Sequence, residues 1–362
     1  MVDDTLDVLA LARYGPLGAS SRVRLDQFRQ YLALDGITIR RRALLDDDLL
    51  RAQYDGLGRS PLMLARAYAR RLVDVLGSRD ADVVWIEKEL APWLPAWAER
   101  ALLSGRRYIL DFDDAVFHNY DTHPSAAVRA LWGRKIDRLI RGAELVVAGN
   151  PYLAARARAA GARRVEILPS VVDIEPYGAA VPPLPGGPFT IGWIGSPGSE
   201  RTLAAIADVL AAEAARPDTR VVLVGASETA LPGIAHETWP WSESAEVAAM
   251  EQFHVGIMPL ADSPWERGKC GYKLIQCLAA GRPVVASPVG VNADIVTPDV
   301  GRLATTPDEW HAAFDELRAD PGLGVQRGRA GRALVERSYT RQVVAPRLAA
   351  LLRAVAVLPP RS

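Results

Sequence analysis

Short apolar runs rich in Val, Ile and Leu alternate with longer helical patterns along most of this chain of 362 residues. In the first part of the chain we expect strands at 6–12, 37–40, 82–86, 108–111, 145–148 and 164–168. Helices are expected between them at 22–34, 61–76, 92–103 and 126–141. Such alternation is typical of a parallel sheet whose strands are joined by crossover helices, so the sequence predicts an α/β fold.

A segment rich in proline and glycine then interrupts the alternation. Residues 176–188 contain five prolines and three glycines. Proline lacks a backbone N–H, and both residue types mark turns and loops, so this segment is not expected to form a core element. We interpret it as an interdomain linker, and a long surface loop is the alternative.

The alternation resumes after this segment, with strands expected at 190–194, 221–224, 254–258 and 283–286. Helices are expected from residue 201 and at 245–252, 272–280, 307–317, 323–338 and 341–357. The sequence therefore predicts two doubly wound domains, at 1–175 and 189–340, followed by a final helical segment at 341–362. Sheets of this type bind ligands outside the carboxyl ends of their strands, so we expect ligands in a cleft between the two domains.

The charges of the chain balance, with 43 Lys and Arg against 43 Asp and Glu. This balance excludes the broad basic surface of a nucleic-acid-binding protein, although it leaves room for a local basic site. Only four of the 43 cations are lysines, and two of these, Lys269 and Lys273, lie close together. A pair of lysines in an arginine-dominated chain indicates such a local site.

Cysteine usage and hydropathy favour a cytoplasmic protein. Cys270 and Cys277 fall in one short segment, which excludes a disulfide framework and fits a reducing compartment. The start of the chain lacks a basic signal-peptide region, and no apolar run reaches the ~18 residues that span a membrane. Arginines at 40–42, 66, 70 and 71 would allow peripheral contact with anionic lipid at the inner face of a membrane, with a solvated helix face as the alternative.

Residues 262–292 are the most informative segment. A loop rich in glycine and charge precedes a helix that is expected to begin near Gly271, and Lys269 and Lys273 flank that helix start. Unsatisfied N–H groups and the helix dipole suit such a start to a phosphate group. Gln276 lies on the same helix face as Lys273 and could hydrogen-bond a ribose. The alternative is a pair of solvated lysines on a surface loop.

This segment resembles the donor site of retaining glycosyltransferases with the GT-B fold, family 4 in particular. The residues 279–287, AAGRPVVAS, fit the A-x-G-x-P-V-V segment of that family. A subgroup motif, K-x-P-x-K-x-x-E, is matched by Lys269, Lys273 and Gln276, with Gly271 in place of proline. Residues 13–24 and 191–197 are similar to the opening loop and to the first strand and turn of the donor domain.

The resemblance implies two Rossmann-like domains, the first on the acceptor side and the second binding the nucleotide-sugar donor. It implies transfer of a sugar from a UDP- or GDP-sugar to a hydroxyl acceptor, with retention and without a metal ion or other cofactor. The residues from 341 onward would be the family's final helix, which crosses back to the first domain.

The sequence also departs from the family pattern. The usual Glu-x7-Glu pair is absent, because Gln276 stands at the second position and Gly268 at the first. Glu266 or Asp262 would have to substitute for the first glutamate. The usual Arg and Lys after the first strand of the donor domain are replaced by a turn that offers Ser196, Ser199 and Arg201.

Two further segments of the first domain are candidates. In the loop after the first strand, small residues such as Gly18 let a phosphate or sugar approach the backbone, and Arg22 could contact the acceptor. Glu87 and Lys88 end an expected strand and resemble a K-E-x-x-P feature of the same subgroup. The alternative interpretation of Glu87 and Lys88 is a cluster of ions on the surface.

An acidic cluster ends the strand expected at 108–111, with Asp111, Asp113 and Asp114 followed by His118. The resemblance implies that Asp113 and Asp114 would line the reacting sugar, with His118 nearby. A second interpretation is a divalent metal bound by D-x-D, and a third is a phosphatase of the haloacid dehalogenase type with Asp111 as nucleophile. Simple capping of the next segment is also compatible with these residues.

The predicted site therefore has three parts. Catalytic roles are assigned to Asp113, Asp114 and Lys273; donor-binding roles to Gly18, Ser196, Arg201, Lys269, Gly271, Lys273 and Gln276; and acceptor-side roles to Arg22, Glu87, Lys88 and His118. No metal ligand is assigned. The alternatives to a glycosyltransferase are the Mg²⁺-dependent phosphatase and a non-catalytic protein that binds nucleotide sugars.

Overall fold

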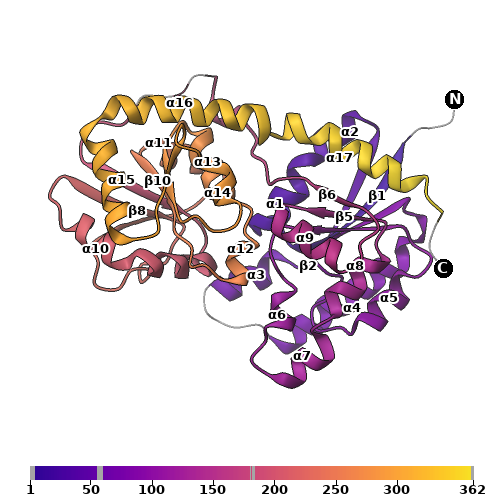
Figure 1. Cartoon of the computed structure of the whole chain (residues 1–362). Coiled ribbons are helices and arrows are strands. Elements are labelled where there is room, and N and C mark those ends of the chain that lie inside the picture. Colours follow the sequence, from indigo (N-terminus) through magenta and orange to yellow (C-terminus); the bar gives the residue numbers. More distant parts are fainter. Residues whose placement is uncertain (1–4, 55–59, 180, 182–183, 360–362) are drawn as a thin grey trace. The chain divides into compact units, whose positions relative to one another are not determined.

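The computed structural model describes residues 5–54, 60–179, 181 and 184–359. The chain forms two compact units (Figure 1). The first unit comprises Met1–Ser170, Gly268–Cys270 and Arg341–Ser362, and the second comprises Val171–Arg267 and Gly271–Thr340. Positions 180, 182 and 183 of the expected linker lie outside the described residues.

The first unit is built on a parallel sheet of six strands in the order β2-β1-β3-β4-β5-β6. The strands are β1 (Leu6–Tyr14), β2 (Ile37–Leu45), β3 (Val83–Glu87), β4 (Tyr108–Phe112), β5 (Leu145–Ala148) and β6 (Val165–Ile167). Every residue of β3, β4 and β5 is buried. These strands read as continuous apolar runs because helices cover both faces of a parallel sheet.

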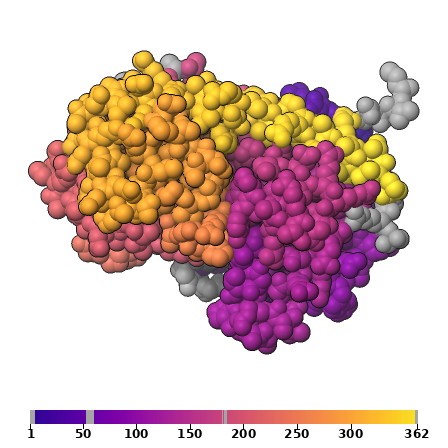
Figure 2. Space-filling view, in the orientation of Figure 1, coloured from indigo at the N-terminus to yellow at the C-terminus, as the bar shows by residue number. Residues whose placement is uncertain are grey.

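The helices of the first unit connect these strands and cover the sheet. They are α1 (Ala19–Arg24), α2 (Arg29–Leu34), α3 (Asp47–Tyr54), α4 (Pro61–Leu76), α5 (Ala96–Leu103), α6 (His118–Asp121), α7 (Ala126–Trp132), α8 (Lys135–Gly142), α9 (Pro151–Ala159) and α17 (Arg341–Ala356), with short 3-10 turns η1 (Asp26–Phe28) and η2 (Gly77–Asp80). The C-terminal helix α17 packs against α2, and Figure 2 shows its yellow atoms beside the indigo N-terminal ones.

The second unit repeats the architecture with the strand order β12-β11-β10-β7-β8-β9, again parallel throughout. Its strands are β7 (Phe189–Ile194), β8 (Thr219–Val224), β9 (Glu237–Trp239), β10 (Val255–Met258), β11 (Val284–Ala286) and β12 (Gly301–Leu303). Its helices are α10 (Ala207–Ala214), α11 (Glu246–Glu251), α12 (Pro264–Arg267), α13 (Tyr272–Ala279), α14 (Asn292–Ile295), α15 (Pro307–Ala319) and α16 (Pro321–Ser338), with 3-10 segments η3 (Glu175–Tyr177) and η4 (Pro197–Ile206). The predicted class, α/β with two doubly wound domains, is confirmed.

Some expected elements differ in their bounds. The helix expected at 22–34 is divided into α1, η1 and α2, because the backbone at Leu25 leaves the helical region (φ −123°, ψ −58°). The helix expected at 92–103 begins only at Ala96, after Pro95, whose ψ of 142° is extended. The beginning of the expected linker belongs to the second unit, since the η3 turn buries Tyr177 in its core.

Both sheets have a topological switch point beside their first strand. The first unit's β1 lies between β2 and β3, and the second unit's β7 lies between β8 and β10. The chain therefore leaves the first strand in one direction and later returns to its other side. In open α/β sheets this arrangement opens a crevice at the carboxyl ends of the strands, where ligands bind.

Candidate active site

In the second unit, α13 begins beside the switch point, and Gly271 precedes its first residue. Gly271 has a φ of 68°, which is left-handed. A Cβ atom at this position would lie 2.4 Å from Cδ1 of Ile295. Proline, whose ring fixes φ at about −65°, cannot adopt this left-handed conformation. The departure from the related K-x-P-x-K motif therefore has a local structural cause.

Lys273 lies in the first turn of α13 and points toward the turn after β7. Its Nζ donates to Oγ of Ser199 at 3.3 Å and lies 5.1 Å from the ring centroid of Trp193. Ser199 is held in place because its Oγ accepts from the Ser196 N–H at 3.1 Å and donates to the Ser196 carbonyl at 2.9 Å. A lysine, a hydroxyl-bearing turn and a helix start thus meet at the switch point of the second unit.

The other donor-side candidates have different environments. Arg201 has a side chain that is 65% exposed, and its guanidinium pairs with Oε1 of Glu266 at 3.3 Å. Glu266 is itself buried. Gln276 is also buried, with 4% of its surface exposed. The structure therefore places Arg201 at the surface near α12, and Gln276 within the packed part of α13.

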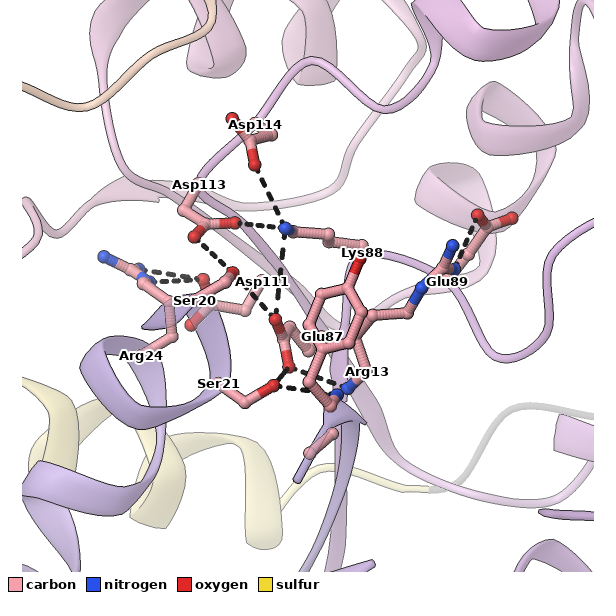
Figure 3. A network of polar contacts seen from close by, with 12 residues as sticks. Arg13, Ser20, Ser21, Arg24, Glu87, Lys88, Glu89, Asp111, Asp113 and Asp114 are labelled. Atoms are coloured by element: carbon pink, nitrogen blue, oxygen red, sulfur yellow. Dashed lines mark hydrogen bonds and ion pairs between the residues drawn. The ribbon is translucent and has the colours of Figure 1, made fainter. Parts of the chain in front are cut away.

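In the first unit, the carboxyl end of β3 carries Glu87, whose carboxylate lies against the start of α1 (Figure 3). Its Oε2 accepts from the backbone N–H of Arg13 at 2.8 Å and from Oγ of Ser21 at 2.5 Å. Its Oε1 accepts from Oγ of Ser20 at 2.8 Å, and Ser20 also contacts Asp113. Glu87 thereby links the loop after β1 to the residues that follow β4.

Lys88 is the cation at the centre of this cluster (Figure 3). Its Nζ lies 3.0 Å from Oδ1 of Asp113 and 3.1 Å from Oδ2 of Asp114. Its backbone has a φ of 66°, a strained conformation for a residue other than glycine. Burial lowers the pKa of Lys88, but Asp113, Asp114 and Glu87 outweigh burial and hold the pKa well above its ordinary value. Lys88 is therefore a permanent positive charge between carboxylates.

Lys269 belongs to the same cluster. Its Nζ lies 2.9 Å from Oδ1 of Asp114, and its carbonyl accepts from Nδ2 of Asn150 at 2.8 Å. Burial raises the pKa of Asp114, but Lys269 and Lys88 outweigh burial, so the pKa falls well below its ordinary value. The two neighbouring lysines of the sequence are thus divided: Lys269 belongs to the first unit and Lys273 to the second.

Gly268 shows why the family's first glutamate is absent here. A Cβ atom on Gly268 would lie 2.5 Å from Cβ and 2.7 Å from the backbone N of Ala115. Neither atom is the end of a flexible side chain, so any side chain at this position would require backbone movement. Glu266, named as a substitute, pairs with Arg201, and Asp262, the other candidate, pairs with Arg267 at 2.6 Å.

Asp111 is buried beneath the cluster. Its Oδ1 accepts from Nε of Arg24 at 2.9 Å, and its Oδ2 accepts from Nε1 of Trp85 at 3.2 Å. Burial raises the pKa of Asp111 to about 6, although Arg24 acts in the opposite direction. A carboxylate that is 1% exposed and held from both sides is poorly placed to attack a phosphate, which counts against the phosphatase interpretation.

Three expected site residues lie outside this cluster. The ring of His118 is engaged on both nitrogens, by Asp121 Oδ1 at 2.7 Å and by the hydroxyl of Tyr152 at 2.8 Å. Arg22 donates to the carbonyl of Pro16 at 3.4 Å, within its own loop. Gly18 precedes α1, and a Cβ there would lie 2.2 Å from Cβ of Tyr14, so the glycine is explained by packing.

The sequence reasoning missed Ser20 and Ser21 as site residues. They occupy the first turn of α1 and bind Glu87, and Ser20 also contacts Asp113. The available signal is their position in the segment between the first expected strand, at 6–12, and the next expected helix, at the edge where Glu87 and Asp113 also lie. The sequence predicts only that the small residues of this segment let a phosphate or sugar approach the backbone, and it assigns no role to their hydroxyls.

Within the described ranges, no group of three or more His, Cys, Asp or Glu side chains is arranged to hold a metal ion. Over the same part of the chain, no helix combines the length and the apolar character that crossing a membrane requires.

Residues 188–320 match the model of the family Glycosyl transferases group 1. This segment is a group 1 glycosyltransferase domain. It contains Ser196, Arg201, Gly271, Lys273 and Gln276, so every donor-side candidate of the second unit lies inside the matched segment. The expected enzyme class, a glycosyltransferase, is confirmed by this match. A search of curated proteins finds no match to the sequence.

Solved structures share the fold of the glycosyltransferase over nearly its whole length. Sucrose-phosphate synthase from Thermosynechococcus elongatus is 15% identical, with 97% of this chain and 99% of that chain covered and a TM-score of 0.71. HepE from Anabaena in complex with UDP-glucose is 16% identical, with 96% of this chain and 100% of that chain covered and a TM-score of 0.69. A glycosyltransferase from Rickettsia africae is 12% identical, with 98% of this chain and 99% of that chain covered and a TM-score of 0.66. These likenesses confirm the GT-B fold.

Proposed function

We propose that this protein transfers a sugar from a UDP- or GDP-sugar to a hydroxyl acceptor. The observation that carries the proposal is the position of Lys273, at the start of α13 and 3.3 Å from Ser199, inside the group 1 domain. A helix start with an adjacent ammonium group favours a diphosphate. The HepE structure, which was solved with UDP-glucose, supports a nucleotide sugar as the donor.

The proposed chemistry is mainly electrostatic. As the glycosidic bond breaks, negative charge develops on the departing nucleoside diphosphate, and fixed cations lower the energy of that state. Lys273 and Arg201 would supply the charge, with the Ser196–Ser199 turn beside them. Contact of Gln276 with the ribose, membership of family 4, retention of configuration and independence from metal ions all remain predictions from the resemblance.

The first unit would supply the acceptor side. Asp113 and Asp114 keep their proposed catalytic role, and Glu87 and Lys88 their acceptor-side role, because these four residues form one connected cluster. Lys88 neutralises part of the negative charge. Each carboxylate oxygen of Glu87, Asp113 and Asp114 already contacts a lysine, a serine or a backbone N–H, and its second lone pair can accept a hydrogen bond from an acceptor hydroxyl.

Nucleotide binding tests the donor site. Replacement of Lys273 by alanine should weaken UDP or GDP binding by about tenfold or more, because it removes a charge-assisted contact. Isothermal titration calorimetry measures this, and the matched control is Arg216→Ala, which removes an exposed cation of the same unit that pairs with Asp315 at 3.0 Å. Equal affinity of the wild type and Lys273→Ala would contradict the assignment.

Transfer itself requires a separate measurement. We expect release of nucleoside diphosphate from a UDP- or GDP-sugar to be unchanged by EDTA, and NMR of the product to show the anomeric configuration of the donor. Tight nucleotide-sugar binding without transfer or hydrolysis would instead favour the non-catalytic binding protein, for which the missing Glu-x7-Glu pair is the argument.

Peripheral membrane contact and a cytoplasmic location also remain predictions. The arginines that suggested lipid contact are largely engaged within the first unit: Arg40 pairs with Asp7, Arg41 with Asp26, Arg42 with Asp74, and Arg70 with Asp46, while Arg71 is buried. Membrane contact is still supported by apolar side chains, because α4 exposes Leu62, Leu72, Val73 and Leu76. Sedimentation with phosphatidylglycerol vesicles tests this contact.

A further inference from the structure

A cluster of aromatic rings lies on the segments that follow β3 and β4, which include the short helices α6 and α7. We call this cluster, Trp93, Tyr120, His123 and Trp132, the aromatic platform. The ring of Trp93 lies 5.2 Å from that of Tyr120, 6.0 Å from that of His123 and 6.1 Å from that of Trp132. All three neighbours stand at steep angles to it, between 75° and 87°. Trp93 is therefore the centre of the platform.

Trp93 combines exposure with a strained backbone. It is 48% exposed, and its φ is 61°. In the described part of the chain, Lys88 is the other non-glycine residue with a positive φ, and Lys88 lies in the acceptor-side cluster. Strained backbone of this kind collects at functional sites, because the surrounding structure must hold it in place.

Contacts on both sides fix the backbone of Trp93. Its N–H donates to the hydroxyl of Tyr120 at 3.2 Å, and its carbonyl accepts from Nε1 of Trp132 at 2.9 Å. These bonds fix the backbone, and the three neighbouring rings restrict the orientation of the half-exposed ring before any ligand binds. A preorganised aromatic surface loses little conformational freedom on binding, which is the property of a recognition site rather than of a packing residue.

The platform is connected to the acceptor-side cluster by hydrogen bonds and an ion pair. The Tyr120 hydroxyl donates to Oε2 of Glu89 at 2.7 Å, and Oε1 of Glu89 pairs with Arg13 at 3.3 Å. The backbone N–H of Arg13 in turn donates to Glu87 at 2.8 Å. The platform and the carboxylates therefore belong to one polar network at the same edge of the sheet.

We infer that the aromatic platform binds a pyranose ring of the acceptor, so that the acceptor is an oligosaccharide rather than a simple alcohol or a lipid. One face of a pyranose consists of C–H groups, which stack on an aromatic ring, while its hydroxyls hydrogen-bond at the edges. The exposed Trp93 ring can provide the stacking surface, and the carboxylates and serines to which the polar network connects it can provide the hydrogen bonds. This inference rests on the proposed function, because it names the substrate class of that same site.

Saturation-transfer NMR with cellotriose, maltotriose, chitotriose and mannotriose tests the inference on the full chain. The informative variant is Trp93→Gly, because glycine accepts a positive φ and only the ring is lost. The matched control is Trp97→Ala on α5, which removes a tryptophan that is 74% exposed. We expect at least one trisaccharide to bind, to lose about tenfold or more in affinity with Trp93→Gly, and to stay within about twofold with Trp97→Ala.

Several results would overturn the inference: no trisaccharide binding to the wild type, equal binding to Trp93→Gly, or an equal loss with Trp97→Ala. Trp93-dependent binding to phosphatidylglycerol vesicles in place of trisaccharides would also overturn it. If Trp93→Gly does not fold, Trp93→Asn replaces it, because asparagine tolerates the left-handed region. UDP and GDP titrations on the same samples separate the two proposals, since nucleotide binding without trisaccharide binding contradicts only this one.

Discussion

Lysine is rare in this chain, and each of the four lysines lies at a polar cluster. Lys88 and Lys269 contact Asp114, Lys135 contacts Glu89 at 2.6 Å and Glu99 at 2.8 Å, and Lys273 contacts Ser199. A buried charge is tolerated only when it is paired, and the compact ammonium groups of Lys88 and Lys135 each lie between two carboxylates. Lys88 and Lys135 are buried, so half of the few lysines carry charge inside the first unit.

Removal of Lys88 should therefore be costly. In a Lys88→Gln variant, Asp113 and Asp114 would remain close together without the cation that separates them, and we expect a loss of about 3 kcal/mol in the free energy of unfolding at neutral pH. Urea denaturation measures this loss. Arg79→Gln, on the η2 turn of the same unit, is the control and should change stability little. A Lys88→Gln protein as stable as the wild type would show that the cluster is not a stabilising ion network.

Glu99 provides a test of pH dependence. Burial raises the pKa of Glu99 from 4.5 to about 7, against the opposing effect of Lys135, and Glu89 raises it further. Its contribution to stability is complete below pH 4.5 and is lost as the pH rises through about 7, because the folded state holds the proton more tightly.

Wild type and Glu99→Gln should therefore differ in the slope of stability against pH. Between pH 5 and pH 8 the wild type should lose on the order of 3 kcal/mol relative to the variant, which has no proton to lose. Denaturant titrations at both pH values give the difference. If the difference in free energy of unfolding between wild type and Glu99→Gln were the same at pH 5 and pH 8, the pKa of Glu99 would be the same in the folded and unfolded protein.

At the scale of elements, the start of α13 depends on Gly271. Alanine at this position would be forced into a left-handed backbone and against Ile295. We expect Gly271→Ala to lower the free energy of unfolding by about 2 kcal/mol and to weaken UDP or GDP binding, because the helix start would move. Calorimetry and nucleotide titration check the two effects.

A second glycine serves as the control for this prediction. Gly77→Ala changes a glycine with a φ of −79°, where a Cβ would meet no atom within 4 Å. Its stability and nucleotide affinity should match those of the wild type. If Gly77→Ala were as harmful as Gly271→Ala, the left-handed backbone and the contact with Ile295 would not be the cause.

The strands and long helices were predictable because each carries a regular pattern over several residues. The strand at Leu145–Ala148 and the helix at Pro61–Leu76 match their expected bounds. The strands Glu237–Trp239 and Gly301–Leu303 were not expected, because neither carries the apolar run that indicates a buried strand. The break between α7 and α8 near Gly133 was also missed, since the apolar pattern continues through it.

At the scale of the whole molecule, the final helix belongs to the first unit. On α17 the apolar residues Val344, Leu348 and Leu352 are buried, and Arg341 lies over the ring of Tyr31 at 4.8 Å. A chain ending at residue 340 should therefore lose most of the thermal stability of the first unit, because these side chains leave apolar partners exposed to water. Scanning calorimetry and limited proteolysis would detect the loss.

A chain ending at residue 359 is the control for this truncation, and it should keep the wild-type transition because α17 stays complete. Equal thermal stability of the chain ending at residue 340 and of the wild type would show that α17 contributes nothing to the first unit.

The order of strands and helices predicted two doubly wound units, and the donor site that the motif around Lys273 predicts stays a prediction. The sequence could not show that Gly268–Cys270 belong to the first unit, because that depends on tertiary contacts such as those of Lys269 with Asp114 and Asn150. It also could not show that Asp111 is closed off by Arg24 and Trp85, whose positions in the chain are distant. The periodicity of apolar residues predicts helices and strands. No pattern in a short stretch of sequence shows which charged residues pair when they are far apart in the chain.

The short segment Gly268–Cys270 has a consequence for how such a chain can be recombined. Because the backbone passes from one unit to the other at residues 170/171, 267/268, 270/271 and 340/341, no single junction separates the two units. A hybrid enzyme made by joining the first part of this chain to the second part of a relative would receive two segments of the first unit, Gly268–Cys270 and Arg341–Ser362, from the wrong parent. Exchange of donor specificity between relatives would thus have to preserve Lys269 together with Asp114, as a matched pair inherited from one parent.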